Sequence, residues 1–393
     1  DTPPPKQGNN ISLIPFFSNN LESVNRGTSN NKIKIGGDLK YSLNSSLNID
    51  ATINPDFSQA EVDQQVTNLD RFELFFPERR QFFLENGDLF SNFGYKTIRP
   101  FFSRRIGLGV PIQAGVRLSG NIDENWRIGL MDIQTRSDEI LNTAAENFGV
   151  ISLQRKVFDR SNVSLIFINK QAVRLNENLI NQSQYNRNIG LEYNYFSADN
   201  LWNSKLMFLK SLSPIKKKQG EVFASHIEYQ STGWKWKLQQ EYITGNYSAE
   251  VGFIPRNNYI KIQATVGHLT YTKKNTSLLS HGPSIERTYY FDTDFSKKDQ
   301  TEQFDYLFNF KNRSRFSIGI RRQYIELLSD FDPLRTNISS LFAGSTHQWN
   351  SYKIKYNSKP QNRFTYSTEL LTGGYYEKGK RTAFLGEFGY RFQ

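Results

Sequence analysis

Apolar and polar residues alternate along most of this chain, and this period of two limits the possible folds more than any other feature. Two clear examples are Ile189, Leu191, Tyr193 and Tyr195, and Phe304, Tyr306, Phe308 and Phe310. Because successive side chains of a β-strand point to opposite faces, each such segment places an apolar row on one face of a strand. No segment approaches the ~20 consecutive apolar residues of a transmembrane helix, so a helical membrane protein is excluded.

The length of the alternating segments favours a membrane-spanning β-barrel over a soluble β-sandwich. They run for about 10 to 12 residues, longer than the ~5–6 of globular sheets and close to the ~9–11 that cross a bilayer. Many apolar rows end in Tyr, Trp or Phe, as the aromatic girdles of outer-membrane barrels do, and aromatic residues make up 14% of the chain. We therefore predict an all-β fold, a transmembrane antiparallel β-barrel in the outer membrane of a Gram-negative cell.

The connections between the segments alternate between short and long, as periplasmic turns and outer loops of such barrels do. Short connections include 158–160, 197–200 and 358–360, and long ones include 171–185, 244–258 and 372–380. We predict eighteen strands: 10–17, 32–43, 46–54, 112–121, 125–135, 146–155, 161–171, 186–196, 201–211, 221–230, 233–243, 259–270, 278–293, 301–311, 314–325, 344–357, 361–371 and 381–392. An even count places both termini in the periplasm, and sixteen strands is the alternative if the first pair is absent.

Residues 10–393 thus form one barrel, after a Pro-rich linker end at residues 1–9. Residues 55–111 interrupt its rhythm between two predicted strands. A loop of this length without periodicity is usually functional or disordered, and its many aromatic residues argue against disorder.

We predict that this segment folds into the lumen and constricts or plugs it, since a barrel of this size otherwise encloses an open channel. The alternative is a structured cap outside the mouth. The charged residues of the predicted plug are Asp56, Glu61, Asp63, Glu73, Glu78, Arg79, Arg80, Glu85, Arg104 and Arg105. We expect the four arginines to pair with Glu73, Glu78, Glu85 and acids of the wall.

Four motifs resemble one known family. They are residues 54–63 (NPDFSQAEVD), 75–86 (FFPERRQFFLEN), 102–107 (FSRRIG) and 251–256 (VGFIPR). Together they resemble the barrel portion of the domain of unknown function 5916 family, whose members are common in Bacteroidota and usually carry an upstream carbohydrate-binding module similar to family nine. The resemblance implies an outer-membrane barrel, and it transfers no catalytic residues.

The last predicted strand points to a partner in assembly. Residues 384–392 resemble the final-strand signal that the barrel-assembly machinery reads during insertion, although Gln393 follows the aromatic Phe392. We expect the inserted barrel to contact outer-membrane lipid and lipopolysaccharide.

The composition argues against an enzyme and against a metal site. The chain has no cysteine, which excludes disulfides, Cys-ligated metals and thiol catalysis. Its four histidines have no HxH or HExxH spacing, and there is no G-x-S-x-G motif. The net charge of +11 is spread along the chain, so we expect no nucleic-acid partner. We predict no catalytic activity, no cofactor and no metal.

Two functions fit these features. The first is passage or capture of a small solute through a constricted lumen, with a glycan-derived solute suggested by the carbohydrate-binding module of the resembled family. The alternative is a non-transporting, plugged barrel that serves as a subunit or scaffold of a larger outer-membrane complex for assembly or secretion.

Overall fold

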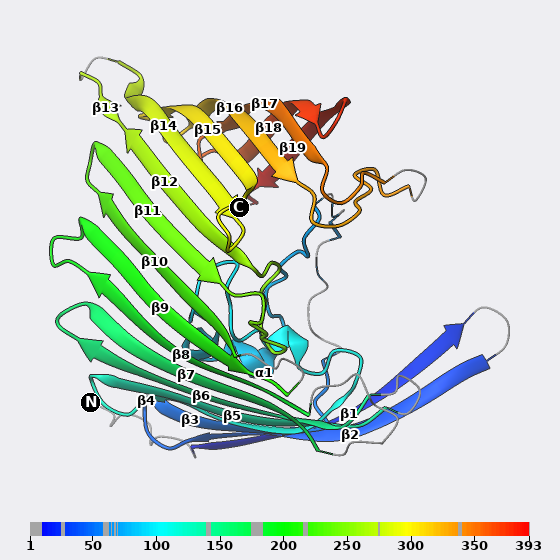
Figure 1. The fold of residues 1–393 in the computed structure, drawn as a ribbon. Helices are drawn as coiled ribbons and strands as arrows, with labels where there is room; N and C mark the ends of the chain where they lie inside the picture. Colours follow the sequence, from blue (N-terminus) through cyan, green and yellow to red (C-terminus); the bar gives the residue numbers. More distant parts are fainter. Residues whose placement is uncertain are drawn as a thin grey trace, which may run out of the picture.

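The alternating segments form the strands of one antiparallel sheet, which curls into an open trough in this computed structural model (Figure 1). The structure describes residues 10–24, 28–57, 63, 65–66, 68, 70–138, 143–173, 184–214, 219–273, 276–336 and 340–392. The strands are β1 (Ile11–Val24), β2 (Thr28–Ser42), β3 (Leu47–Ile53), β4 (Ile112–Asn121), β5 (Trp126–Thr135), β6 (Glu146–Val157), β7 (Ser161–Ala172), β8 (Tyr185–Phe196), β9 (Trp202–Leu212), β10 (Gly220–Gln230), β11 (Trp234–Ile243), β12 (Tyr259–His268), β13 (Thr270–Tyr271), β14 (Leu278–Phe291), β15 (Lys297–Phe310), β16 (Arg315–Glu326), β17 (Thr346–Asn357), β18 (Phe364–Tyr375) and β19 (Gly379–Tyr390).

The predicted all-β fold and its count of eighteen long strands are confirmed within the described residues. The two-residue strand β13 continues β12 beyond Leu269, and both pair with β14. If β12 and β13 are counted as one, the nineteen strands of the sheet become the eighteen that were predicted. Each full-length strand pairs with its neighbours in the sequence. The first predicted strand, 10–17, is too short, because β1 extends to Val24 along β2.

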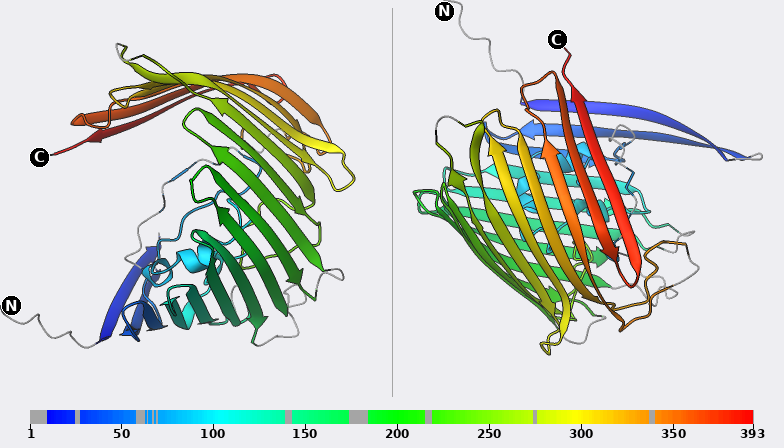
Figure 2. Two further views of the ribbon diagram at one scale, coloured as in Figure 1. Left: turned by 90° about the vertical axis from the view of Figure 1, so that its left-hand side faces the viewer. Right: turned by 90° about the horizontal axis from the view of Figure 1, so that it is seen from above.

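The predicted closure into a barrel is not seen in the described part of the chain, where β1 pairs with β2 alone and β19 with β18 alone. The first hairpin extends beyond its neighbour in the sheet. β1 pairs with β2 along Thr28–Tyr41, whereas β3 pairs only with Gly37–Ser42, so residues 28–36 of β2 pair with β1 alone. In the left view of Figure 2 the hairpin lies at the bottom, and β18 and β19 lie at the top.

One predicted loop length is wrong. Residues 372–380 were expected to form a long connection, but β18 continues to Tyr375 and β19 begins at Gly379. The Gly373-Gly374 pair is a sequence typical of loops, yet it lies within β18. The neighbouring strand β17 passes so close here that only glycine fits. A Cβ added to Gly374 would lie 2.7 Å from the Cβ of Trp349.

The outer face of the sheet exposes rows of apolar side chains. Leu191, Phe208 and Phe223 lie opposite one another on β8, β9 and β10, and they are 52%, 43% and 49% exposed. A second row, on β16 to β19, consists of Ile318, Ile354, Leu370 and Phe384. Such a contiguous exposed apolar surface is unusual for a protein in water.

Aromatic rings cluster on the outer face along the edge with the short turns. The ring centroids of Trp202 and Trp236 are 4.9 Å apart, and Tyr229 lies 5.1 Å from Trp202. Further along this edge, Phe308 lies 5.8 Å from Phe316, and Phe364 lies 6.0 Å from Phe388. The aromatic residues therefore follow the edge from β9 to β19.

The inner face packs against the segment between β3 and β4. This segment contains the short helices α1 (Gln81–Leu84) and α2 (Asp88–Ser91) and the 3₁₀ turn η1 (Ser103–Arg105). Its buried side chains join those of β5 to β10 in one cluster, which includes Phe83, Phe90, Phe93, Ile98, Ile133, Val150, Ile166 and Leu209. No helix of the described residues is both long and apolar enough to cross a membrane.

A buried ion pair connects the wall to this segment. Arg117 of β4 is 1% exposed and donates a 2.6 Å hydrogen bond from Nη2 to Oδ2 of Asp50 on β3. Its Nη1 donates to the carbonyl oxygen of Phe82 in α1. One guanidinium group thus holds two strands and the segment together.

We predict that Arg117→Met lowers the free energy of unfolding by about 3 kcal/mol, because it removes the hydrogen-bonded partner of the buried Asp50 carboxylate and leaves only Lys40, 3.9 Å from Oδ1, as a counterion. Urea-induced unfolding of the folded protein in detergent measures the loss. The double variant Asp50→Asn/Arg117→Met removes both charges and should lose less. A single variant as stable as the original chain would contradict the importance of this pair.

Candidate functional site

The segment is held together by a network around Glu78. Arg80 donates from Nε and Nη2 to the two carboxylate oxygens of Glu78, at 2.9 and 2.7 Å, and the Ser103 hydroxyl donates to Oε2 at 2.6 Å. Arg80 also donates to the carbonyl oxygens of Ser103 and Ile106, at 2.7 and 2.9 Å. The network joins two of the quoted motifs, residues 75–86 and 102–107.

Burial disfavours the charged form of Glu78, but the hydrogen bonds and charge of Arg80, with the Ser103 hydroxyl, outweigh it. The pKa of Glu78 therefore lies below its ordinary value of 4.5. The carboxylate is ionised at neutral pH and holds both motifs in place.

Three further ion pairs lie in the described part of the same segment. Arg104 donates from Nη1 to Oδ1 of Asp63 at 2.8 Å, and Nε of Arg79 lies 3.8 Å from the same oxygen. The hydrogen bond and charge of Arg104 hold the pKa of Asp63 below its usual value. Arg105 pairs with Glu73, and its Nε donates to the Gly252 carbonyl oxygen at 3.2 Å.

The remaining predicted residues lie elsewhere or outside the description. Glu85 pairs with Lys40 of β2 and accepts a 3.5 Å hydrogen bond from Asn48 of β3, so it faces the wall and not the four arginines. Asp56 is half-buried, and Glu61 lies outside the described residues. That these charges line a solute path stays a prediction.

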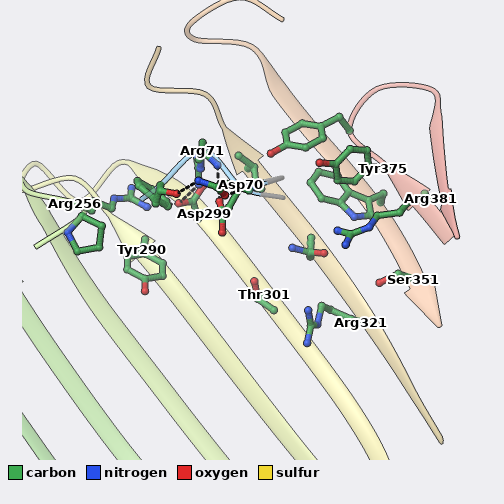
Figure 3. A pocket seen from close by; sticks show the side chains of 18 of the residues that line it. Asp70, Arg71, Arg256, Tyr290, Asp299, Thr301, Arg321, Ser351, Tyr375 and Arg381 are labelled. Carbon is green, nitrogen blue, oxygen red and sulfur yellow. Dashed lines mark hydrogen bonds and ion pairs between the residues drawn. The ribbon is translucent and has the colours of Figure 1, made fainter. Parts of the chain in front are cut away.

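The segment also borders a cavity of about 550 Å³ on the inner face of the later strands (Figure 3). Arg71 and Phe72 of the segment form one side, and Arg256 lies in the connection before β12. The opposite side consists of inward side chains of β14 to β19, among them Arg321 and Arg381. The cavity therefore brings together residues more than 300 positions apart.

Asp299 of β15 joins the segment to this wall. Arg71 donates from Nη2 to Oδ2 of Asp299 at 2.6 Å, and Arg256 pairs with the same oxygen. Arg71 donates a further 3.0 Å bond to the carbonyl oxygen of Glu326. All three charged side chains are nearly buried, and because one carboxylate serves two guanidinium groups the cluster keeps a net positive charge.

Sequence reasoning missed these cavity residues, although some of them carried a signal. Arg256 is the last residue of the quoted motif 251–256. Arg321 has an odd number, whereas the apolar Ile318, Ile320 and Tyr324 of the same strand have even numbers, so the alternation predicts that Arg321 lies on the opposite face. Arg71 and Asp299 carry no local signal, because their pairing depends on the tertiary fold. Among the described residues no three His, Asp or Glu side chains form a group able to hold a metal.

Residues 9–129 match the profile of DUF5916, a domain of unknown function. The predicted family is thereby confirmed over this part of the chain, which includes β1 to β4 and the whole segment. No curated protein sequence matches the chain.

The solved structures that are similar to the chain include two from one organism. One is OccK9 (OpdG) from Pseudomonas aeruginosa, with 8% sequence identity and a TM-score of 0.37 over 96% of this chain and 98% of that one. The other is the outer membrane protein OpdK from the same organism, with 8% identity and a TM-score of 0.36 over 96% of this chain and 94% of that one.

We predict that the segment loosens in acid. A carboxylate whose folded pKa is depressed contributes stability above its unfolded pKa, and this stability is lost as the pH falls through the folded value. For Glu78 the loss begins near pH 4.5 and is complete below its lowered pKa. Hydrogen exchange of residues 75–86 and 102–107 should therefore accelerate as the pH falls below 4.5, beyond the intrinsic pH effect on exchange.

The variant Glu78→Gln is the matched control for this prediction. Because residue 78 cannot titrate in this variant, the amides of residues 75–86 and 102–107 should already exchange faster at pH 7. Their exchange should then accelerate less when the pH is lowered. An acid step of the same size in both proteins would show that Glu78 is not its source.

Proposed function

We propose that this protein is an outer-membrane β-barrel that lets a small solute pass, or captures it, within a lumen constricted by residues 55–111. The observation that carries the proposal is the division of the sheet into two faces. The outer face exposes apolar rows such as Leu191, Phe208 and Phe223, while the inner face carries the ion pairs and the cavity.

A lipid environment explains the outer face. An apolar band bordered by aromatic rings matches the bilayer core and its interfaces, and the aromatic edge from Trp202 to Phe388 provides that border on the side of the short turns. In this proposal the short turns and both chain ends face the periplasm. The sheet closes when the unpaired edges of β1 and β19 meet, since an open sheet edge is not tolerated within hydrocarbon.

The inner face explains the constriction. The segment covers the inner side of β4 to β10, where its aromatic residues are buried, and it leaves the cavity open beside β14 to β19. A solute path through this part would run past charged and aromatic side chains, which select by charge and size. The proposal assigns no catalytic group and no cofactor to the chain.

A second candidate function is a non-transporting subunit of a larger outer-membrane complex. The free edges of β1 and β19 favour it, because unpaired backbone groups bind added strands. Purification in mild detergent tests it: a stable stoichiometric complex, with no current from the isolated chain, would favour the subunit over the channel.

We predict that the chain conducts ions in a planar lipid bilayer and that Arg80→Ala raises the conductance. The substitution removes the hydrogen bonds from Arg80 to the carbonyl oxygens of Ser103 and Ile106 and leaves only the Ser103–Glu78 bond between these residues, so the constriction loosens and widens. Arg313→Ala, at an exposed arginine in a short turn, removes the same charge and should leave the conductance unchanged. Unchanged current and unchanged thermal stability in Arg80→Ala would contradict a lumenal role for the segment.

A further inference from the structure

The cavity beside β14 to β19 contains more positive than negative charge. Four arginines line it, Arg71, Arg256, Arg321 and Arg381, with only Asp70 and Asp299 as acids. Asp299 is already shared by Arg71 and Arg256. Within the described chain, no carboxylate lies at ion-pair distance from Arg321 or Arg381, so both remain available to an anion.

Both arginines are held in place by uncharged neighbours. Arg321 donates from Nε and Nη2 to Oε1 of Gln303, at 3.0 and 2.7 Å, which fixes the plane of the guanidinium group and leaves Nη1 free of this contact. Arg381 lies over the ring of Tyr375, 5.6 Å from its centroid. Both side chains line the cavity (Figure 3), and the strand register places Ser351 of β17 and Gly373 of β18 between them. A guanidinium group held in this way matches the planar carboxylate better than a mobile lysine does.

The rest of the lining is suited to a hydroxylated ring. Thr301, Gln323 and Ser351 supply hydroxyl and amide groups on the strands that flank Arg321. Trp349 and Tyr375 supply ring faces, and their centroids are 6.3 Å apart. The volume of about 550 Å³ lies in the range of small-molecule sites, ~300–1,000 Å³.

We propose that this cavity binds a sugar acid, a ring with several hydroxyl groups and one carboxylate. The carboxylate binds to Arg381. Nη1 of Arg321 and the side chains of Thr301, Gln323 and Ser351 bind the hydroxyls, and the C–H face of the ring packs on Trp349 or Tyr375. A purely aromatic carboxylate leaves the polar groups of the lining unpaired, and a neutral sugar leaves Arg381 unpaired. This inference rests on the proposed function, and it names the class of solute.

Calorimetric titration of the full chain in detergent, at constant ionic strength and pH 7, tests the proposal. Galacturonate should bind at least about tenfold more tightly than galactose, which lacks the charge, and than benzoate, which lacks the hydroxyls. Equal affinity for galacturonate and galactose would overturn the role of the arginines. Equal affinity for galacturonate and benzoate would overturn the assignment to a sugar.

Variants locate the site. Arg321→Met and Arg381→Met should each weaken galacturonate binding about tenfold. Arg322→Met removes the next arginine of β16, which is exposed on the outer face, and should leave binding unchanged. Equal losses in Arg321→Met and Arg322→Met would overturn the site. If a variant fails to fold, the comparison of the three ligands on the unaltered chain still tests the proposal.

The titration requires no membrane, so its result is separate from that of the conductance experiment. Galacturonate binding without current leaves the sugar-acid site standing and contradicts passage. Current without preferential galacturonate binding leaves passage standing and contradicts the site.

Discussion

In an antiparallel sheet, neighbouring side chains of a strand point to opposite faces, and this chain uses that constraint along eighteen long strands. On β16 the apolar Ile318 and Ile320 face outward, while Arg321 faces the cavity. A register shift of one residue would exchange the two faces. The pairing of the strands therefore decides which side chains meet lipid and which surround the lumen.

The inner face of the sheet has two regions, one covered by the segment and one that lines the cavity. Beside β4 to β10 it is covered by the segment, through a buried aromatic cluster and the Asp50–Arg117 pair. Beside β14 to β19 it lines the cavity, where the Asp299 cluster attaches the segment and two arginines stay without a carboxylate partner in the described residues. The same segment thus closes one part of the trough and borders the open part.

Much of this architecture could be predicted from sequence, because a period of two is a local property. It predicted the strand count and the interruption at residues 55–111, and it carried the signal by which the inward direction of Arg321 could have been found. The Glu78–Arg80 pair was also within reach, since its members are two positions apart. Contacts such as Arg71–Asp299 and Glu85–Lys40 were not, because they depend on how the segment returns to the wall.

The central claim is that the outer face contacts lipid and the inner face encloses water. The chain has no cysteine, so single cysteines at Ile320 and Arg321 can carry spin labels without background. In liposomes, the label at position 320 should be reached by oxygen more readily than by a water-soluble nickel complex, and the label at position 321 should show the reverse. Equal access of the nickel complex to both positions would contradict the account.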